Sequence, residues 1–147
     1  MKKLFMLFIF SLLVISVNAQ IRKIPSAVTD AFKEKFPNAE KVEWKDKLTY
    51  FEASFNIGGT DMTADFSHKG EWQETDKTMS FDDLSGHVKD GLKKSKYADW
   101  TPGSVAEIKK KGKDTQYRIY VEKSSLIQKK FLYFNKEGKL EREAQTL

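Results

Sequence analysis

The fold is decided by the stretch Asp65-Phe66-Ser67-His68-Lys69-Gly70-Glu71-Trp72, because its pattern returns near the end of the chain as Tyr133-Phe134-Asn135-Lys136-Glu137-Gly138-Lys139-Leu140. In each copy an aromatic residue closes a strand-like run, a four-residue turn ends in Gly, and a large apolar residue follows two positions later. This pattern is typical of two antiparallel strands joined by a turn. Its return at an offset of 68 residues predicts an internal duplication.

A helical segment precedes each copy of this pattern. Residues Ile24–Lys33 carry apolar side chains at helical spacing, and Pro25 suits a first helical turn. Residues Leu84–Lys93 repeat this spacing at an offset of 60, after Ser80 and Asp83 at the spacing of a capping box. Each copy therefore begins with a helix.

Four short strands are predicted after each helix, with Gly58-Gly59 as a hairpin turn signal in the first copy. The predicted strands are Lys41–Lys45, Thr49–Ile57, Thr60–Phe66 and Glu71–Met79, then Val105–Lys111, Thr115–Lys123, Leu126–Phe134 and Lys139–Gln145. We therefore expect an α+β protein of two helix-plus-four-strand repeats, residues 21–80 and 81–147. Because a unit of about 60 residues is marginal alone, we expect the repeats to share one core.

The N-terminus has the organisation of a cleavable signal peptide. Lys2 and Lys3 precede an apolar run from Leu4 to Val17, and Ala19 ends a small-residue cleavage site. The alternative is a membrane anchor, but the run is shorter than the roughly 20 residues that span a bilayer. We expect residues 1–19 to be removed, leaving residues 20–147 as one domain without a membrane span, in the periplasm or outside the cell.

Composition excludes several classes of protein. The chain has no Cys, so disulfides, thiol catalysis and an acylated lipoprotein anchor are excluded. Its net charge of +5 falls to +3 when Lys2 and Lys3 leave with the signal peptide. The basic residues are mixed with acidic ones, so we expect solvated surfaces and no nucleic-acid partner.

Catalytic and metal-binding signatures are missing from the sequence. His68 and His87 have no second ligand at a zinc-site spacing, and no Gly-x-Ser-x-Gly or phosphate-binding glycine loop occurs. We therefore predict no enzyme activity, no cofactor and no metal. One alternative stays open: Glu52, Asp61 and Asp65 could form a carboxylate site for a cation or a small ligand.

Strand alternation assigns side chains to the two faces of the sheet. Residues 51, 53, 55 and 57 are apolar and alternate with Tyr50, Glu52, Ser54 and Asn56, so we expect the apolar set to face the helices. In the second copy the third strand is ambiguous by alternation, but Leu132 and Phe134 match Ala64 and Phe66 of the first copy, so we expect these two to be buried and Phe131 and Tyr133 to be exposed. A register error of one residue, or aromatics that simply cover the sheet, would remove this exposed patch.

The "Val-Glu-Trp" strand at Val42–Trp44 and the strand-turn-strand at Asp65–Trp72 resemble those of the PepSY-like proteins of Gram-negative envelopes, whose fold resembles the β-lactamase inhibitor protein. The resemblance implies one continuous curved sheet of about eight strands with helices on its convex face, in a family mostly of unknown function. The inhibitor that lends its name to the fold binds its target through the concave face and is disulfide-bonded, unlike this chain.

These observations favour a non-enzymatic exported binding module of the cell envelope. It would recognise a protein or peptide on the concave face, as an inhibitor or modulator of a periplasmic enzyme. Tyr and Arg are enriched in such surfaces. The predicted partner-binding residues are Tyr50, Glu52, Thr63, Asp65, Arg118, Tyr120, Phe131 and Tyr133. The alternatives are a small-ligand or cation carrier and, third, a hydrolase.

Overall fold

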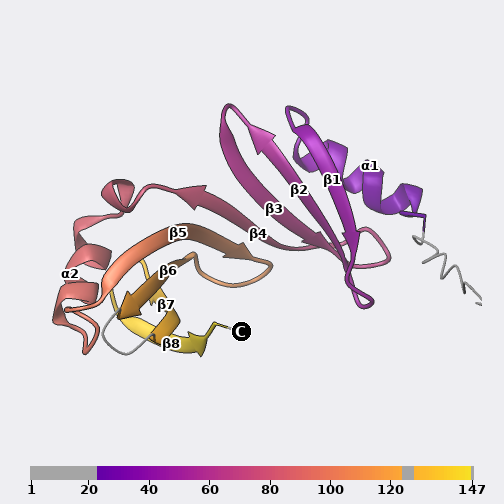
Figure 1. The fold of residues 1–147 in the computed structure, drawn as a ribbon. Coiled ribbons are helices and arrows are strands. Elements are labelled where there is room, and N and C mark those ends of the chain that lie inside the picture. The colour runs from indigo at the N-terminus through magenta and orange to yellow at the C-terminus, as the bar shows by residue number, and fades with distance from the viewer. Residues whose placement is uncertain (1–22, 124–127, 147) are drawn as a thin grey trace, which may run out of the picture.

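The computed structural model describes residues 23–123 and 128–146. Its elements, in order, are α1 (Ser26–Lys35), β1 (Glu40–Asp46), β2 (Phe51–Ile57), β3 (Thr60–Phe66), β4 (Trp72–Met79), the 3-10 turn η1 (Phe81–Asp83), α2 (Gly86–Lys94), β5 (Thr101–Lys110), β6 (Gln116–Lys123), β7 (Gln128–Asn135) and β8 (Leu140–Gln145). Each half of the described chain is a helix followed by four strands (Figure 1). The predicted α+β class is confirmed; the predicted signal peptide, residues 1–19, lies outside the described residues.

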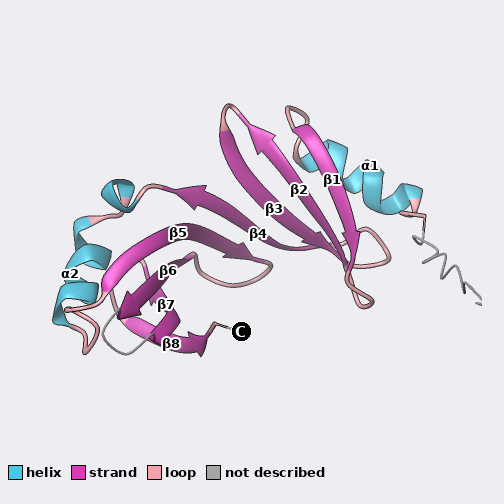
Figure 2. Ribbon diagram, in the orientation of Figure 1, coloured by secondary structure: helices cyan, strands magenta, loops and turns pink. Residues whose placement is uncertain are grey.

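The eight strands of the described chain form one antiparallel sheet in which strands adjacent in sequence are adjacent in space. The two halves meet where β4 pairs with β5, from Met79 opposite Val105 to Glu74 opposite Lys110. The sheet is curved, and α1 and α2 lie at its opposite ends (Figure 2). The predicted continuous curved sheet is therefore confirmed.

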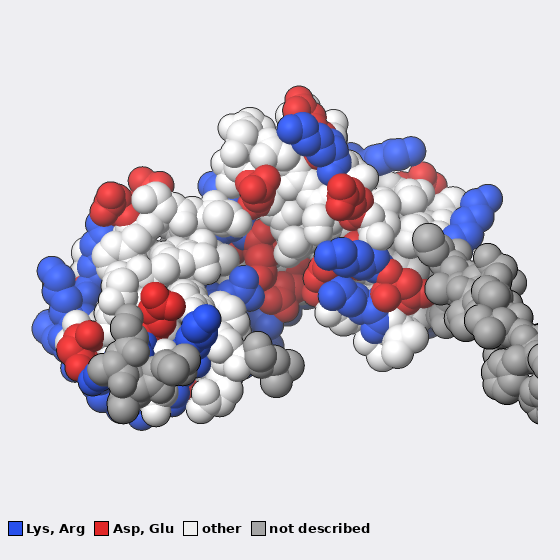
Figure 3. Space-filling model, viewed as in Figure 1, with Lys and Arg blue, Asp and Glu red and all other residues white. Residues whose placement is uncertain are grey.

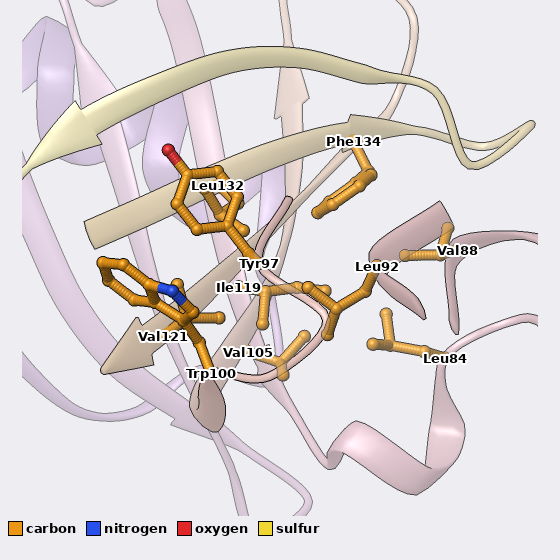
Figure 4. Packing of buried hydrophobic residues seen from close by; sticks show 10 residues of the cluster. All are labelled: Leu84, Val88, Leu92, Tyr97, Trp100, Val105, Ile119, Val121, Leu132 and Phe134. Carbon is orange, nitrogen blue, oxygen red and sulfur yellow. The ribbon is translucent and has the colours of Figure 1, made fainter. Parts of the chain in front are cut away.

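Each helix packs on its own half of the sheet and builds its own core. In the first half, Val28 and Phe32 of α1 pack with buried aromatic side chains of β2 and β3. In the second half, Val88 and Leu92 of α2 pack against Ile119 and other apolar side chains of β6 and β7 (Figure 4). The two clusters have no residue in common. The expectation of one shared core is wrong, because the curved sheet holds its two helices apart.

The faces of the strands follow the predicted alternation. Phe51, Ala53 and Phe55 are buried on the helix side. In the second half, Ile119 lies opposite Leu132, and both are fully buried. The register of β7 is therefore the predicted one. The Gly58-Gly59 hairpin also forms, with both φ angles positive.

The start of the second helix differs from the prediction. α2 begins at Gly86, and the Ser85 hydroxyl oxygen accepts a hydrogen bond from the Val88 N–H at 3.4 Å. Ser80, which we expected to cap this helix, instead caps η1 by accepting from the Asp82 N–H at 3.2 Å. Two Ser residues at similar spacing before one apolar run explain the misassignment.

Several strand boundaries differ from the predicted ones by one residue, and the starts of β2 and β5 differ by more. β5 begins at Thr101 instead of Val105, because a register shift between Pro102 and Val105 lets the Pro-Gly segment join the sheet. β2 begins at Phe51 instead of Thr49, because Leu48 has a φ of 68° and the chain turns there. Leu126, the predicted start of the third strand in the second repeat, lies outside the described residues.

Candidate binding surface

The sheet face opposite the two helices is called the open face here. Strand pairing places the predicted site residues on it: Glu52 lies opposite Asp65, Arg118 opposite Tyr133, and Tyr120 opposite Phe131. Thr63 shares a strand face with Asp65, and Tyr50 directly precedes β2. The eight residues therefore lie on one face in two groups, a first-half group and a second-half group, with β4 and β5 between them.

The second-half group centres on an aromatic pair. The rings of Tyr120 and Phe131 meet edge to face with centroids 5.8 Å apart, and the Arg118 guanidinium carbon lies 5.3 Å from the Phe131 centroid. Gly103 of β5 leaves room for this arrangement, because a Cβ there would lie 2.7 Å from Cδ1 of Tyr120. These three side chains, called the aromatic patch below, are held in place by one another and stay partly exposed.

Tyr133 lies on the open face but is not exposed, so the prediction of an exposed anchor there is wrong. Its exposed fraction is 8%. The Arg142 guanidinium of β8 covers its ring, 3.6 Å from the centroid. Arg142 lies opposite Tyr133 in the strand pairing. On the open face, Arg142 therefore lies over Tyr133.

Glu52 and Asp65 of the first-half group form a row of three carboxylates with Glu74, on the neighbouring strands β2, β3 and β4. We call it the acidic row. Lys47 lies 3.5 Å from Glu52 at one end, and Lys110 lies 2.7 Å from Glu74 at the other. Asp65 lies between the two glutamates, and no other described side chain forms an ion pair or a hydrogen bond with its carboxylate; Lys47 acts on it only as a more distant charge. Like charges directly opposite one another on a sheet repel.

Asp76 links the acidic row to the aromatic patch. Asp76 is a residue of β4 and lies opposite Thr63 of β3. Its Oδ2 atom is 2.8 Å from Nη1 of Arg118 on β6. The contact crosses β5, where Ile108 is opposite Asp76 and is fully buried outside both cores. The other carboxylate oxygen of Asp76 is buried without a hydrogen-bond partner among the described side chains. The ion pair thus joins the two halves on their open face.

Burial and neighbouring negative charges raise the pKa values of Asp65 and Asp76. Burial, followed by the charges of Glu52, Glu74 and Asp76, raises the pKa of Asp65 to about 7, and Lys47 opposes this shift. Burial also raises the pKa of Asp76, although Arg118 works against it. Asp65 is therefore part protonated near neutral pH.

Figure 3 shows where these charges lie on the molecule. Acidic atoms gather in the hollow between the two halves of the sheet, with basic atoms at its margins.

Of the three carboxylates expected to form a cation site, Glu52 and Asp65 lie opposite each other, but Asp61 lies apart from them. Asp61 accepts a hydrogen bond of 3.0 Å from the Asn56 amide beside the Gly58-Gly59 turn, away from Glu52 and Asp65. In residues 23–123 and 128–146, no group of three or more His, Asp or Glu side chains could hold a metal ion. His68 packs against the Phe51 ring with centroids 4.9 Å apart, and His87 is exposed on α2.

The sequence interpretation missed Glu74, Asp76 and Arg142. Glu74 lies opposite Asp65, and Asp76 lies opposite Thr63. The pairing of the predicted hairpin could therefore have placed Glu74 and Asp76 on the open face. The position of Arg142 could be predicted only from the register of β8, and a bulge between Tyr133 and Phe134 shifts that register.

The sequence of the chain shows that it belongs to a known protein family. Residues 49–142 match the family described as "Putative beta-lactamase-inhibitor-like, PepSY-like", and the match covers more than half of the chain. The predicted resemblance is therefore confirmed. No curated protein sequence matches the chain.

Solved structures from Bacteroides share the fold. A BLIP-like protein from Bacteroides fragilis is 26% identical with a TM-score of 0.74, covering 83% of this chain and 86% of its own. A DUF2874 family protein from Bacteroides ovatus is 24% identical with a TM-score of 0.78, covering 82% and 86%. A structure from Bacteroides eggerthii, described among "putative periplasmic proteins", is 22% identical with a TM-score of 0.78, covering 82% and 88%.

The described part of the chain contains no helix that is long and apolar enough to cross a membrane.

Proposed function

We propose that this chain is a non-enzymatic, exported binding module of the cell envelope that recognises a protein or peptide on its open face. The binding residues are Tyr50, Glu52, Thr63, Asp65, Arg118, Tyr120 and Phe131, with Tyr133 reached through Arg142. In this role it inhibits or modulates a periplasmic enzyme.

The observation that carries this proposal is the difference between the two faces of the sheet. The helices and both cores cover one face, while the other presents the aromatic patch beside partly buried charges. Tyr and Arg that are held in place lose little side-chain entropy when they bind, and they combine apolar area with a polar group. A face built in this way favours recognition of another macromolecule over chemistry at a single atom.

Two further observations support the envelope setting. The N-terminal 19 residues have the pattern of a cleavable signal peptide. A structure of the same fold from Bacteroides eggerthii is described among "putative periplasmic proteins". Periplasmic and extracellular locations are both compatible with this pattern.

Site-specific photo-crosslinking in the host cell tests the proposal. A photoreactive phenylalanine analogue replaces Phe131 on the open face or Lys94 on α2, which is exposed on the opposite side. We expect one protein to cross-link from position 131 and not from position 94. The captured protein is then purified and its complex with the wild-type chain is measured by isothermal calorimetry.

Substitution of the aromatic patch provides the matched test. Tyr120→Ala with Phe131→Ala should lower the affinity at least about tenfold, since truncation of buried hot-spot side chains costs roughly 2 kcal/mol or more. Lys94→Ala is the control. An unchanged affinity in the double variant, with its fold verified by circular dichroism, would refute recognition on the open face.

A further inference from the structure

We propose that the partner inserts a Lys or Arg side chain into the open face against Asp65, beside an apolar side chain that packs on Tyr120 and Phe131. This inference rests on the proposed function and deepens it, because it names the chemistry that the partner must present. It follows from which charges of the open face are matched within the chain.

Three of the four central carboxylates already have a cation from this chain. Glu52 has Lys47 at 3.5 Å, Glu74 has Lys110 at 2.7 Å, and Asp76 has Arg118 at 2.8 Å. Each cation approaches from the margin of the row or from the second half. Among these four carboxylates of the described chain, Asp65 is the one without an ion pair of its own.

The position of Asp65 makes an internal partner hard to supply. It is the middle residue of the acidic row, with Glu52 on one neighbouring strand and Glu74 on the other. A half-buried carboxylate between two others is unfavourable for two reasons. Burial removes part of its hydration, and the low dielectric around it strengthens the repulsion from its neighbours. A cation that arrives from outside the sheet relieves both costs, so binding and charge neutralisation occur together.

A protein side chain matches this position better than a metal ion. Divalent ions take several oxygen ligands at once, and no group of three acidic or His side chains in the described chain could hold one. Lys47, Lys110 and Arg118 already occupy the neighbouring carboxylates. One Lys or Arg head group needs one or two carboxylate oxygens, and its aliphatic stem adds apolar contact.

The Asp76–Arg118 pair indicates which two surfaces of the open face the partner covers together. It connects the acidic row to the aromatic patch, so both surfaces belong to one continuous region of the open face. A partner segment that crosses β5 places its cation over the first half and its apolar neighbour over the second. A cation next to a large apolar residue is therefore the expected recognition feature.

This arrangement makes binding depend on pH. The groups that face Asp65 are Glu52 of β2, Glu74 and Asp76 of β4, and Lys47 and Tyr50 of the segment before β2. Because the pKa of Asp65 is about 7, part of the population is protonated at neutral pH. A bound cation favours the carboxylate, so affinity rises with pH, by about tenfold between roughly pH 6 and roughly pH 8.

Selection from a phage-displayed library of random linear dodecapeptides tests the inference without knowledge of the natural partner. The bait is the purified exported chain, as wild type, Asp65→Asn or Asp61→Asn. Asp61→Asn is the matched control, because it removes the same charge from the same strand face at its exposed end. Peptides selected on the wild type are then synthesised, and their affinities are measured at both pH values.

We expect wild-type and Asp61→Asn baits to select peptides that carry Lys or Arg next to a large apolar residue. The Asp65→Asn bait should lose this cationic preference. The synthetic peptides should bind the wild type about tenfold more tightly at the higher pH, and this difference should vanish in Asp65→Asn.

Other outcomes separate this inference from the proposed function. Peptides that depend on Phe131 but show no cationic preference, or that bind Asp65→Asn with the same pH dependence, would overturn the cation inference and leave open-face recognition standing. If no selected peptide is sensitive to substitution at Asp65, Tyr120 or Phe131, both proposals fail.

Discussion

Gly70 and Gly138 occupy the same place in the two halves, each closing a strand-to-strand turn against the first residues of the helix of its own half. Their φ angles are 84° and 81°. A Cβ on Gly70 would lie 2.4 Å from the carbonyl oxygen of Ala27, and one on Gly138 would lie 2.0 Å from that of His87. Ala27 and His87 are 60 residues apart, which is the offset of the two predicted helices. This shared contact supports duplication of one helix-plus-strands unit.

Gly138→Ala should destabilise the protein more than a positive φ alone explains. An Ala in the left-handed region costs roughly 1–2 kcal/mol, and the contact with the His87 carbonyl forces the helix and the turn apart as well. Gly112→Ala is the control, since Gly112 has a φ of 68° but open space around its Cβ. Urea denaturation should show a clearly larger loss of unfolding free energy for Gly138→Ala; equal losses would contradict the contact.

Asp65→Asn should stabilise the protein at alkaline pH. The pKa of Asp65 is raised from 3.8 to about 7, so the folded chain holds this proton more tightly than the unfolded chain does. Stability therefore falls as pH rises from about 4 to about 7. Asn mimics the protonated acid and removes this loss.

Thermal unfolding of the wild type and Asp65→Asn, followed across this pH range, measures the effect. The melting temperature of Asp65→Asn should exceed that of the wild type at about pH 8, and the difference should shrink towards pH 4. Asp61→Asn controls for the change in formal charge. A wild-type advantage that grows with pH would show that the carboxylate is stabilised in the fold.

Glu143 has the opposite effect on the pH dependence of stability. The hydrogen bond from Lys96, followed by those from Tyr97 and Lys130, lowers the pKa of Glu143 from 4.5 to about 2. Its contribution is present above about pH 4.5 and is lost as pH falls through 2. Glu143→Gln should flatten the fall in stability over this acid range in chemical denaturation. Because the group is largely solvated, we expect a modest effect, and an unchanged acid profile would contradict the assignment.

Core substitutions should act mainly on one half. Phe66→Ala removes a fully buried ring from the first core, and Phe134→Ala removes its counterpart from the second. Each should cost about 3–5 kcal/mol. Hydrogen exchange should increase most in α1 and β1–β3 for Phe66→Ala, and in α2 and β6–β8 for Phe134→Ala. Uniform acceleration over both halves would indicate one cooperative unit.

Much of the fold could be predicted because two signals in the chain agree. The strand-turn-strand motif at Asp65–Trp72 returns in the second half, and alternation in β2 and β6 separates buried from exposed side chains. The register of β7 was predicted from the match of Leu132 and Phe134 with Ala64 and Phe66 in the first copy. The structure has this register, because a slip by one residue would expose the apolar side chains of Leu132 and Phe134.

The candidate site was harder to predict, because it depends on pairs between strands that are distant in sequence. Alternation could place Tyr133 on the open face, but the cover over its ring comes from Arg142 on β8. Asp76 and Arg118 are brought together across β5, so neither residue has a local signal for the other. The single core was expected from chain length, but the curvature of the sheet decides how many cores form.

The separate cores also affect how the specificity of such a protein can evolve. Substitutions accepted in one core leave the packing of the other helix unchanged, because the two clusters share no side chain. The open face, in contrast, is assembled from both halves. Descendants of the duplicated unit can therefore alter the charged half and the aromatic half independently, and acquire new partners by changing one at a time.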